Sequence, residues 1–108
     1  MKNMFIAVYE FNIKPGKEEQ FRQSWLKTTQ AIFKELGSLG SRLHSTDDPL
    51  KFVAYAQWPN MDLWANNNGL REHESILAIE DMRECIENSK TVYKLQVTDD
   101  YLQQTQYA

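Results

Sequence analysis

Apolar residues alternate with a period of two from Met4 to Ile13, near the start of the chain. This alternation predicts a β-strand, and because both of its faces begin with apolar residues, we expect a central strand covered on both sides. The Lys14–Gly16 segment contains Pro and Gly and predicts a turn directly after it.

The apolar period changes to three or four residues between Lys17 and Leu36, which predicts an amphipathic helix. Its apolar stripe consists of Phe21, Trp25, Thr28 or Thr29, Ile32 and Leu36, widened by Leu26 and Phe33. Glu18 and Glu19 favour the positive N-terminal end of this helix, and Gly37 predicts its C-terminal stop.

Two further strands are predicted in the middle of the chain, from Gly40 to Thr46 and from Lys51 to Trp58. The Asp47–Pro49 segment between them predicts a turn, so we expect the two strands to pair as a hairpin. Pro59 lacks an N–H group and biases the residue before it towards extended backbone, which ends the second of these strands.

A short helix is predicted from Asn60 to about Asn67, because an Asn side chain can accept a hydrogen bond from the free N–H groups at a helix start. The Asn66–Gly69 segment then breaks the helix. The remaining pattern predicts a longer helix from about Arg71 to Ser89, a fourth strand from Thr91 to about Val97, and a polar tail from Asp99 to Ala108.

The predicted order is β-α-β-β-α-β, which is the ferredoxin-like α+β pattern of a four-stranded antiparallel sheet with helices on one face. The other face would expose Ile6, Val8 and their neighbours on adjacent strands. A large apolar patch on a soluble protein indicates an interface, and a two-fold dimer that packs sheet against sheet would cover it. We therefore expect a homodimer through the open face of the sheet.

Composition fits a single globular domain over residues 1–108. The formal net charge of −3 argues against a nucleic-acid partner, which needs a basic surface. No apolar run approaches the roughly 20 residues of a membrane span, and no signal-peptide cleavage site is evident. Cys85 is the single cysteine, so no internal disulfide is expected and the expected location is the reducing cytoplasm.

Signatures for metals and phosphates are missing from the sequence. Its histidines and cysteine have no zinc-site spacing, and Gly37, Gly40 and Gly69 fit neither a dinucleotide-binding motif nor a P-loop. Cys85 has no neighbouring basic cluster or His partner, so we expect no nucleophilic role for it. We therefore expect neither a metal nor a cofactor.

Three segments carry a resemblance that, together with the element order, covers roughly the whole chain. They are VYEFNIKPGKEEQF (residues 8–21), GSLGSRLH (residues 37–44) and FVAYAQWPNMDLW (residues 52–64). In this order they resemble the antibiotic biosynthesis monooxygenase domain, a family of the dimeric α/β-barrel group. The resemblance implies a homodimer with one ligand cavity per subunit, between helices and sheet. The family includes cofactor-independent monooxygenases of polyphenols, quinol oxygenases and haem-degrading oxygenases, so it implies a cavity but no single reaction.

The same resemblance implies candidate site residues. A polar, cavity-facing position late on the first strand corresponds to Tyr9, which can hydrogen-bond a phenolic or quinone oxygen or can be a core tyrosine. The family's tryptophan on the short helix corresponds to Trp64, which can stack on a flat substrate or cap the core. Asn66 and Asn67 offer amide groups nearby. Arg83 can stabilise a substrate anion or only extend out of the apolar stripe.

Other aromatic and basic residues have structural interpretations beside the functional ones. Trp58 fits a framework position at a strand end, and Trp25 fits the core unless the cavity opens beside it. His44, beside Arg42 on the predicted second strand, can face the cavity or the dimer interface, or have a purely structural role. His73 would be an iron ligand only in the haem-degrading branch, which carries Asn where this chain has Tyr9.

Three functions remain as alternatives. The first is a cofactor-independent monooxygenase that oxidises a small aromatic or quinol-like ligand with O₂, with a site formed by Tyr9, Trp64, Arg83 and Asn67. The second is a haem-degrading oxygenase, which the missing Asn and the displaced His73 disfavour. The third is a non-enzymatic dimer that binds a small molecule, or a subunit whose barrel is only structural.

Overall fold

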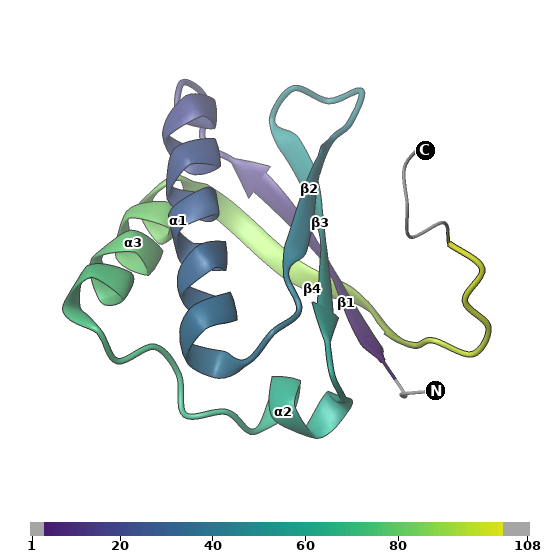
Figure 1. Ribbon diagram of the computed structural model, residues 1–108. Coiled ribbons are helices and arrows are strands. Elements are labelled where there is room, and N and C mark those ends of the chain that lie inside the picture. Colours follow the sequence, from purple (N-terminus) through teal and green to yellow (C-terminus); the bar gives the residue numbers. More distant parts are fainter. Residues whose placement is uncertain (1–3, 103–108) are drawn as a thin grey trace, which may run out of the picture.

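An antiparallel sheet with its helices on one face forms the fold of the computed structural model, which describes residues 4–102 (Figure 1). The strands are β1 (Phe5–Ile13), β2 (Ser41–Ser45), β3 (Lys51–Trp58) and β4 (Ile86–Gln96), in the spatial order β2-β3-β1-β4. The helices are α1 (Glu18–Leu36), α2 (Met61–Ala65) and α3 (His73–Glu84). The predicted ferredoxin-like α+β architecture is confirmed.

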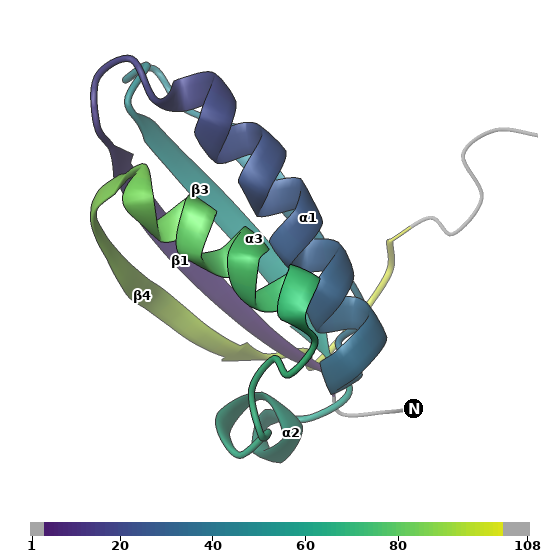
Figure 2. The same ribbon diagram turned by 90° about the vertical axis from the view of Figure 1, so that its left-hand side faces the viewer.

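Helices α1 and α3 lie side by side over the sheet, and the short helix α2 lies beyond their ends (Figure 2). The N-terminus of α2 is held as predicted, because the Asn60 side chain accepts a hydrogen bond from the Leu63 N–H at 2.8 Å. Gly37 ends α1 with φ of 83°, a conformation that favours glycine. No helix in the described part of the chain is long and apolar enough to cross a membrane.

The boundary between α3 and β4 differs from the prediction. The predicted helix ran to Ser89, whereas α3 ends at Glu84 and β4 begins at Ile86. Residues 86–89 pair with the end of β1, where Ile86 faces Ile13 and Ser89 faces Phe11. Backbone pairing with the central strand therefore overrides the helical pattern of this segment, which local propensity alone does not reveal.

The buried face of α1 is narrower than the predicted stripe. Leu26 and Phe33, which were expected to widen it, are 47% and 58% exposed. The buried face contains Phe21, Ser24, Thr28 and Ala31. At about 100° per residue, Leu26 and Phe33 lie on nearly the opposite side of the helix from these four residues, so they point away from the sheet.

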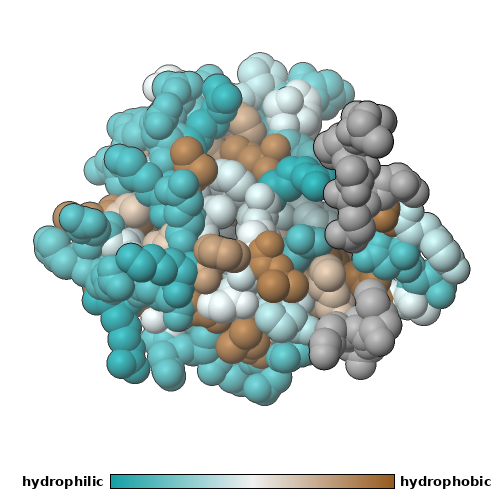
Figure 3. Space-filling model, viewed as in Figure 1, coloured by the Kyte–Doolittle hydropathy of each residue, from teal (hydrophilic) through white to brown (hydrophobic). Residues whose placement is uncertain are grey.

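Two hydrophobic clusters fill the space between the sheet and the helices. One contains Phe11, Ile13, Phe21, Phe52, Ala54 and Cys85, and the other contains Phe5, Ala7, Ala56 and Trp58. Tyr9 packs against both clusters. Figure 3 shows hydrophilic residues over most of the helical layer, with hydrophobic residues gathered between that layer and the sheet.

The sheet face opposite the helices is less exposed than predicted. Ile6, expected to be exposed, is 3% exposed and lines a hollow together with residues 97–102, which lie on the side of the sheet away from the helices (Figure 1). Tyr93 and Leu95 remain 59% and 44% exposed. Of the predicted polar tail, residues 103–108 lie outside the described part of the chain.

Candidate functional site

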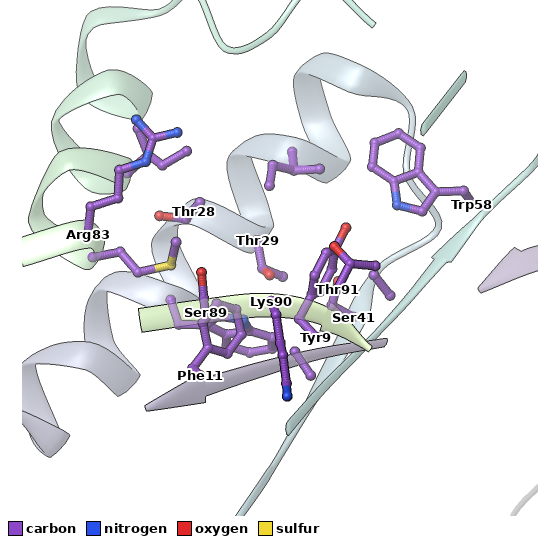
Figure 4. Close-up of a pocket in the computed structure, with 16 residues that line it drawn as sticks. Tyr9, Phe11, Thr28, Thr29, Ser41, Trp58, Arg83, Ser89, Lys90 and Thr91 are labelled. Carbon is purple, nitrogen blue, oxygen red and sulfur yellow. The ribbon is translucent and has the colours of Figure 1, made fainter. Parts of the chain in front are cut away.

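A cavity of about 570 Å³ lies between the sheet and helices α1 and α3 (Figure 4). It has an apolar wall formed by side chains of both layers, among them Phe11, Trp25, Ile32 and Trp58. Hydroxyl-bearing residues interrupt this wall: Tyr9, Thr28, Thr29, Ser41, Ser89 and Thr91. An apolar pocket with a few polar groups is typical of a small-molecule site.

Tyr9 lines this cavity, and its hydroxyl is hydrogen-bonded to Trp64, which does not line the cavity. The Trp64 Nε1–H donates to the Tyr9 hydroxyl oxygen at 2.6 Å. An indole N–H can only donate, so the phenolic proton of Tyr9 is not used in this bond. Tyr9 can therefore donate its own proton to an acceptor in the cavity.

The protonation state of Tyr9 supports a donor role. Burial raises the pKa of the Tyr9 phenol above its usual value, and the hydrogen bond from Trp64 opposes this rise. A phenol with a raised pKa stays protonated at neutral pH. Tyr9 is therefore a hydrogen-bond donor and not a general base under these conditions.

Small residues on the neighbouring strand leave room beside Tyr9. Ala54 lies directly opposite Tyr9 in the β1–β3 register, and Ala56 lies opposite Ala7. Both Ala54 and Ala56 line the cavity. Ala54 and Ala56 are two positions apart, so their side chains lie on the same face of β3. Each side chain is a single methyl group, and β3 therefore leaves space in the cavity beside Tyr9.

The three tryptophans stand in different relations to the cavity. Trp64 lies on α2 and packs against Phe5 with ring centroids 5.0 Å apart, but it is not among the residues that line the cavity. Trp58 is 4% exposed and does line the cavity. Trp25 also lines it, so the cavity opens beside the first helix. Trp64 thus acts on the cavity through Tyr9, and Trp58 and Trp25 form its wall.

The asparagines after α2 hold that helix and do not reach the cavity. The Asn67 amide nitrogen donates to the carbonyl oxygens of Leu63 at 3.2 Å and Trp64 at 3.0 Å. The Asn66 amide nitrogen donates to the Asp62 carboxylate at 2.8 Å. Asn67 therefore supports the helix that carries Trp64, and it does not line the cavity as the predicted site requires.

Two cationic side chains, Arg83 and Lys90, border the cavity, and they differ in their surroundings. Arg83 lies on α3, lines the cavity and forms no ion pair within residues 4–102. Lys90 also borders the cavity, but its ammonium group lies 3.7 Å from the Glu10 carboxylate, and Figure 4 shows its side chain pointing away from the helices. The lining residues of the described chain include no Asp, Glu or His.

The histidines lie outside the cavity. His73 is the exposed first residue of α3, and His44 lies on the exposed edge strand β2 with its Nδ1 2.9 Å from the Val53 carbonyl oxygen. Cys85 is fully buried, and burial raises the pKa of its thiol. Within residues 4–102 no group of His, Cys, Asp and Glu side chains is arranged to hold a metal ion.

Sequence reasoning missed the hydroxyl groups of Thr28, Ser41, Ser89 and Thr91. Ser and Thr occur in every kind of structure, so their presence carries no signal. The pairing of β4 with β1 would have revealed two of them, because Ser89 faces Phe11 and Thr91 faces Tyr9. The helix predicted through Ser89 hid the first of these pairs, whereas Thr91 already lay at the start of the predicted fourth strand.

Comparison with known proteins identifies relatives of the chain. The family model described as antibiotic biosynthesis monooxygenase matches residues 4–78. A solved structure from Bordetella bronchiseptica, named as a candidate antibiotic biosynthesis monooxygenase, has a TM-score of 0.74 and 17% identity, covering 90% of this chain and 99% of that one.

Two further solved structures are similar. SnoaB from Streptomyces nogalater, named as a cofactor-independent oxygenase, has a TM-score of 0.67 and 15% identity, with 95% of this chain and 99% of that chain covered. PA3566 from Pseudomonas aeruginosa has a TM-score of 0.68 and 16% identity, with 92% and 98% covered. At these identities the similarity establishes a shared fold.

Proposed function

The chain belongs to the antibiotic biosynthesis monooxygenase family, and we propose that it is a cofactor-independent monooxygenase that oxidises a small aromatic or quinol-like ligand with O₂ in the cavity. One observation carries the proposal: the Tyr9 hydroxyl borders an aromatic-walled cavity while Trp64 occupies one of its lone pairs. This leaves the phenolic proton available for an oxygen of a bound ligand, in an apolar site where such a donor acts most strongly.

The reaction requires an electron-rich substrate anion. A phenol that has lost its proton transfers an electron to O₂, and the resulting radical and superoxide combine to form a carbon–oxygen bond. The peroxide anion formed in this way takes up one proton, equal to the one that the phenol released, and the resulting hydroperoxide loses water and gives a quinone. One atom of O₂ remains in the product and the other leaves as water, so phenol and O₂ yield quinone and water without another reductant.

Tyr9 and Arg83 are the groups that can stabilise this anion. The Tyr9 O–H can donate to the oxygen that carries charge, and the Arg83 guanidinium adds a positive charge at the wall of the cavity. Trp58 and Trp25 supply flat apolar surface against an aromatic ring. Trp64 and Asn67 act behind this wall, because Asn67 holds α2 and Trp64 holds Tyr9.

The residues that line the cavity limit how acidic the substrate must be. The lining residues within the described chain include no Asp, Glu or His, and Tyr9 stays protonated at neutral pH. The cavity therefore offers no general base of ordinary kind. The substrate must ionise by itself near neutral pH, as hydroquinones with electron-withdrawing substituents do more readily than simple phenols.

Oxygen uptake with a panel of quinols and polyphenols tests the proposal. We expect consumption of O₂ above the rate of spontaneous oxidation, with incorporation of one ¹⁸O atom from labelled O₂ into the product. Tyr9→Phe is the matched variant, because it keeps the ring and removes the hydroxyl, which is both the donor to the ligand and the acceptor of the Trp64 bond. Tight binding of the panel without uptake would contradict turnover and would favour the non-enzymatic binding dimer.

Hemin titration separates the haem-degrading alternative. His73 is exposed and does not line the cavity, so a Soret band that is lost in His73→Ala is not expected. Such a band would replace the present proposal with haem degradation.

The open face of the sheet supports a further proposal, that the protein works as a homodimer. Tyr93 and Leu95 are exposed on this face, and both pair with apolar residues of β1, Val8 and Ile6. β4 is also an exposed edge strand, which offers unpaired backbone groups. Packing two such faces against each other would remove the apolar patch from water.

A further inference from the structure

The Thr28 hydroxyl is buried and has no hydrogen-bond partner in the described part of the chain. Thr28 is 2% exposed and lines the cavity from α1. A hydroxyl inside a helix can donate to the carbonyl one turn earlier, as Ser24 does to Gln20 at 2.7 Å. Thr28 lies one turn after Ser24 on the same buried face but does not use this option. The Thr28 hydroxyl therefore stays buried without a hydrogen bond until a ligand with a polar group enters the cavity.

The surroundings of this hydroxyl are positive and rich in donors. Figure 4 shows the Thr28 oxygen turned towards the side of the cavity where Arg83 lies, and it shows the Ser89 hydroxyl pointing from β4 towards α1. Arg83 has no ion-pair partner within residues 4–102, and no carboxylate lines the cavity there. We call the part bounded by Thr28, Arg83 and Ser89 the α3 end of the cavity.

The opposite part of the cavity has another character. Figure 4 shows Tyr9, Ser41 and Trp58 grouped away from Arg83. The Tyr9 hydroxyl there is a neutral donor, while the α3 end offers a neutral donor together with a full positive charge. Apolar side chains such as Phe11 and Ile32 complete the wall. A ligand that satisfies both parts has a flat apolar body with an oxygen function at each end.

We propose that the α3 end of the cavity is a carboxylate subsite and that the ligand is a hydroxylated aromatic acid, with its carboxylate on Thr28 and Arg83 and its ring oxygen on Tyr9. A carboxylate carries one negative charge, which matches one guanidinium, and it accepts hydrogen bonds from Thr28 and Ser89 hydroxyls as well. A phosphate would bring more negative charge than this end neutralises. The proposal rests on the cavity being the ligand site of the proposed function, but it does not depend on turnover. With such a ligand Arg83 pairs with the carboxylate, and Tyr9 is the group that stabilises the charge on the ring oxygen.

Access to Thr28 requires a small movement. The Thr28 oxygen is closed to solvent, so a carboxylate must displace a neighbouring side chain to reach it. Met82 lines the same cavity from α3, beside Arg83. An unbranched thioether side chain adapts easily to a new neighbour. We expect the movement to be confined to side chains of this kind.

The test compares two ligands that differ only in the carboxylate, 6-hydroxy-2-naphthoate and 2-naphthol, by quenching of tryptophan fluorescence. The native protein should bind the acid at least tenfold more tightly. Thr28→Val keeps the shape but removes the hydroxyl, and it should lower this preference about tenfold while the affinity for 2-naphthol stays unchanged. Its thermal unfolding midpoint should stay the same or rise, because an unpaired buried hydroxyl is removed.

Three further variants sharpen the result. Thr28→Ser keeps a hydroxyl and should keep most of the preference for the acid, and Arg83→Gln should lower that preference. Ser24→Ala removes a paired hydroxyl on the same helix face, so it should lower the unfolding midpoint and leave the preference unchanged. Equal affinity of the native protein for both ligands would overturn the proposal. So would a Thr28→Val variant that weakens both ligands equally or that lowers the midpoint with the preference retained.

These outcomes separate the subsite from the proposed reaction. A preference for the acid that depends on Thr28, together with no O₂ uptake, would support the subsite and contradict the monooxygenase. Uptake with neutral quinols and no preference for the acid would support the monooxygenase and overturn the subsite.

Discussion

The indole nitrogen of Trp64 donates a hydrogen bond of 2.6 Å to the phenol oxygen of Tyr9, joining a short helix to the central strand across 55 positions of the chain. This bond fixes the direction in which Tyr9 can use its own proton. Trp64, which does not line the cavity, therefore leaves the Tyr9 proton for an acceptor other than itself.

Loss of the Trp64 donor should weaken the action of Tyr9. Trp64→Phe keeps an aromatic ring against Phe5 but removes the N–H, so the pKa of Tyr9 should rise further, because the bond from Trp64 opposes the rise due to burial. We expect the kcat of a quinol substrate to fall about tenfold, which corresponds to ~1.4 kcal/mol. Ultraviolet titration of the tyrosines and oxygen-electrode assays measure the two effects.

Tyr9→Phe provides the comparison for that variant, with a fall in kcat of about 100-fold if the hydroxyl stabilises the reacting anion. In the double variant the Trp64 change should add little, because both act through one hydroxyl. Additive losses would show that Trp64 acts independently of Tyr9.

Phe21 should be essential for stability. It is fully buried, and its ring lies 5.3 Å from the ring of Phe11 and 5.4 Å from that of Phe52, measured between centroids. Phe21→Ala should lower the free energy of unfolding by about 3–5 kcal/mol, measured by urea denaturation. Phe33→Ala on the same helix is the control, because Phe33 is 58% exposed and its loss should change stability by roughly 0.5 kcal/mol or less.

Glu35 should make stability depend on acid pH. Its carboxylate accepts hydrogen bonds from the backbone N–H of Arg71 at 2.8 Å and from the Ser75 hydroxyl, so it ties the end of α1 to the start of α3. These bonds hold the pKa of Glu35 below its usual value. A carboxyl with a lower pKa in the folded state stabilises the protein above its unfolded-state pKa of about 4.3 and loses this effect as the pH falls through its folded-state value.

Glu35→Gln measures this contribution. The native protein should exceed the variant in thermal unfolding midpoint at neutral pH, and the difference should shrink as the pH is lowered below about 4.3. A difference that stays constant down to the lowest pH would show that the charge of Glu35 plays no part.

The proposed dimer should dissociate when its apolar face is charged. Light scattering of the native protein should give twice the chain mass of 12.7 kDa. Leu95→Lys places a charge on the open face and should shift the mass towards a monomer. Leu26→Lys is the matched control, since Leu26 is similarly exposed, at 47% against 44%, but lies on α1. A native protein with the mass of a monomer would contradict the proposed dimer.

Sequence patterns were sufficient for the elements whose structure is local. The Lys51–Trp58 strand, the Asn60 cap and the Gly37 helix end were all predicted, because each depends on neighbouring residues: a stop at Pro59, a side-chain oxygen near free N–H groups, and a left-handed glycine. The order of these elements was also enough to predict the ferredoxin-like sheet. Tyr9 and Arg83, two of the residues predicted for the site, both line the cavity.

Only the tertiary structure decided which residues share the cavity. Residues 86–89 follow a helical pattern but pair with β1, so the positions of Ser89 and Thr91 depend on a strand more than 70 residues away. Trp58 and Trp64 lie six positions apart in one motif, yet Trp58 lines the cavity while Trp64 packs behind Tyr9. The sequence determined the elements and the types of residue available, because local backbone chemistry does not need distant partners. The side from which each side chain meets the cavity depends on packing between layers, which no local pattern contains.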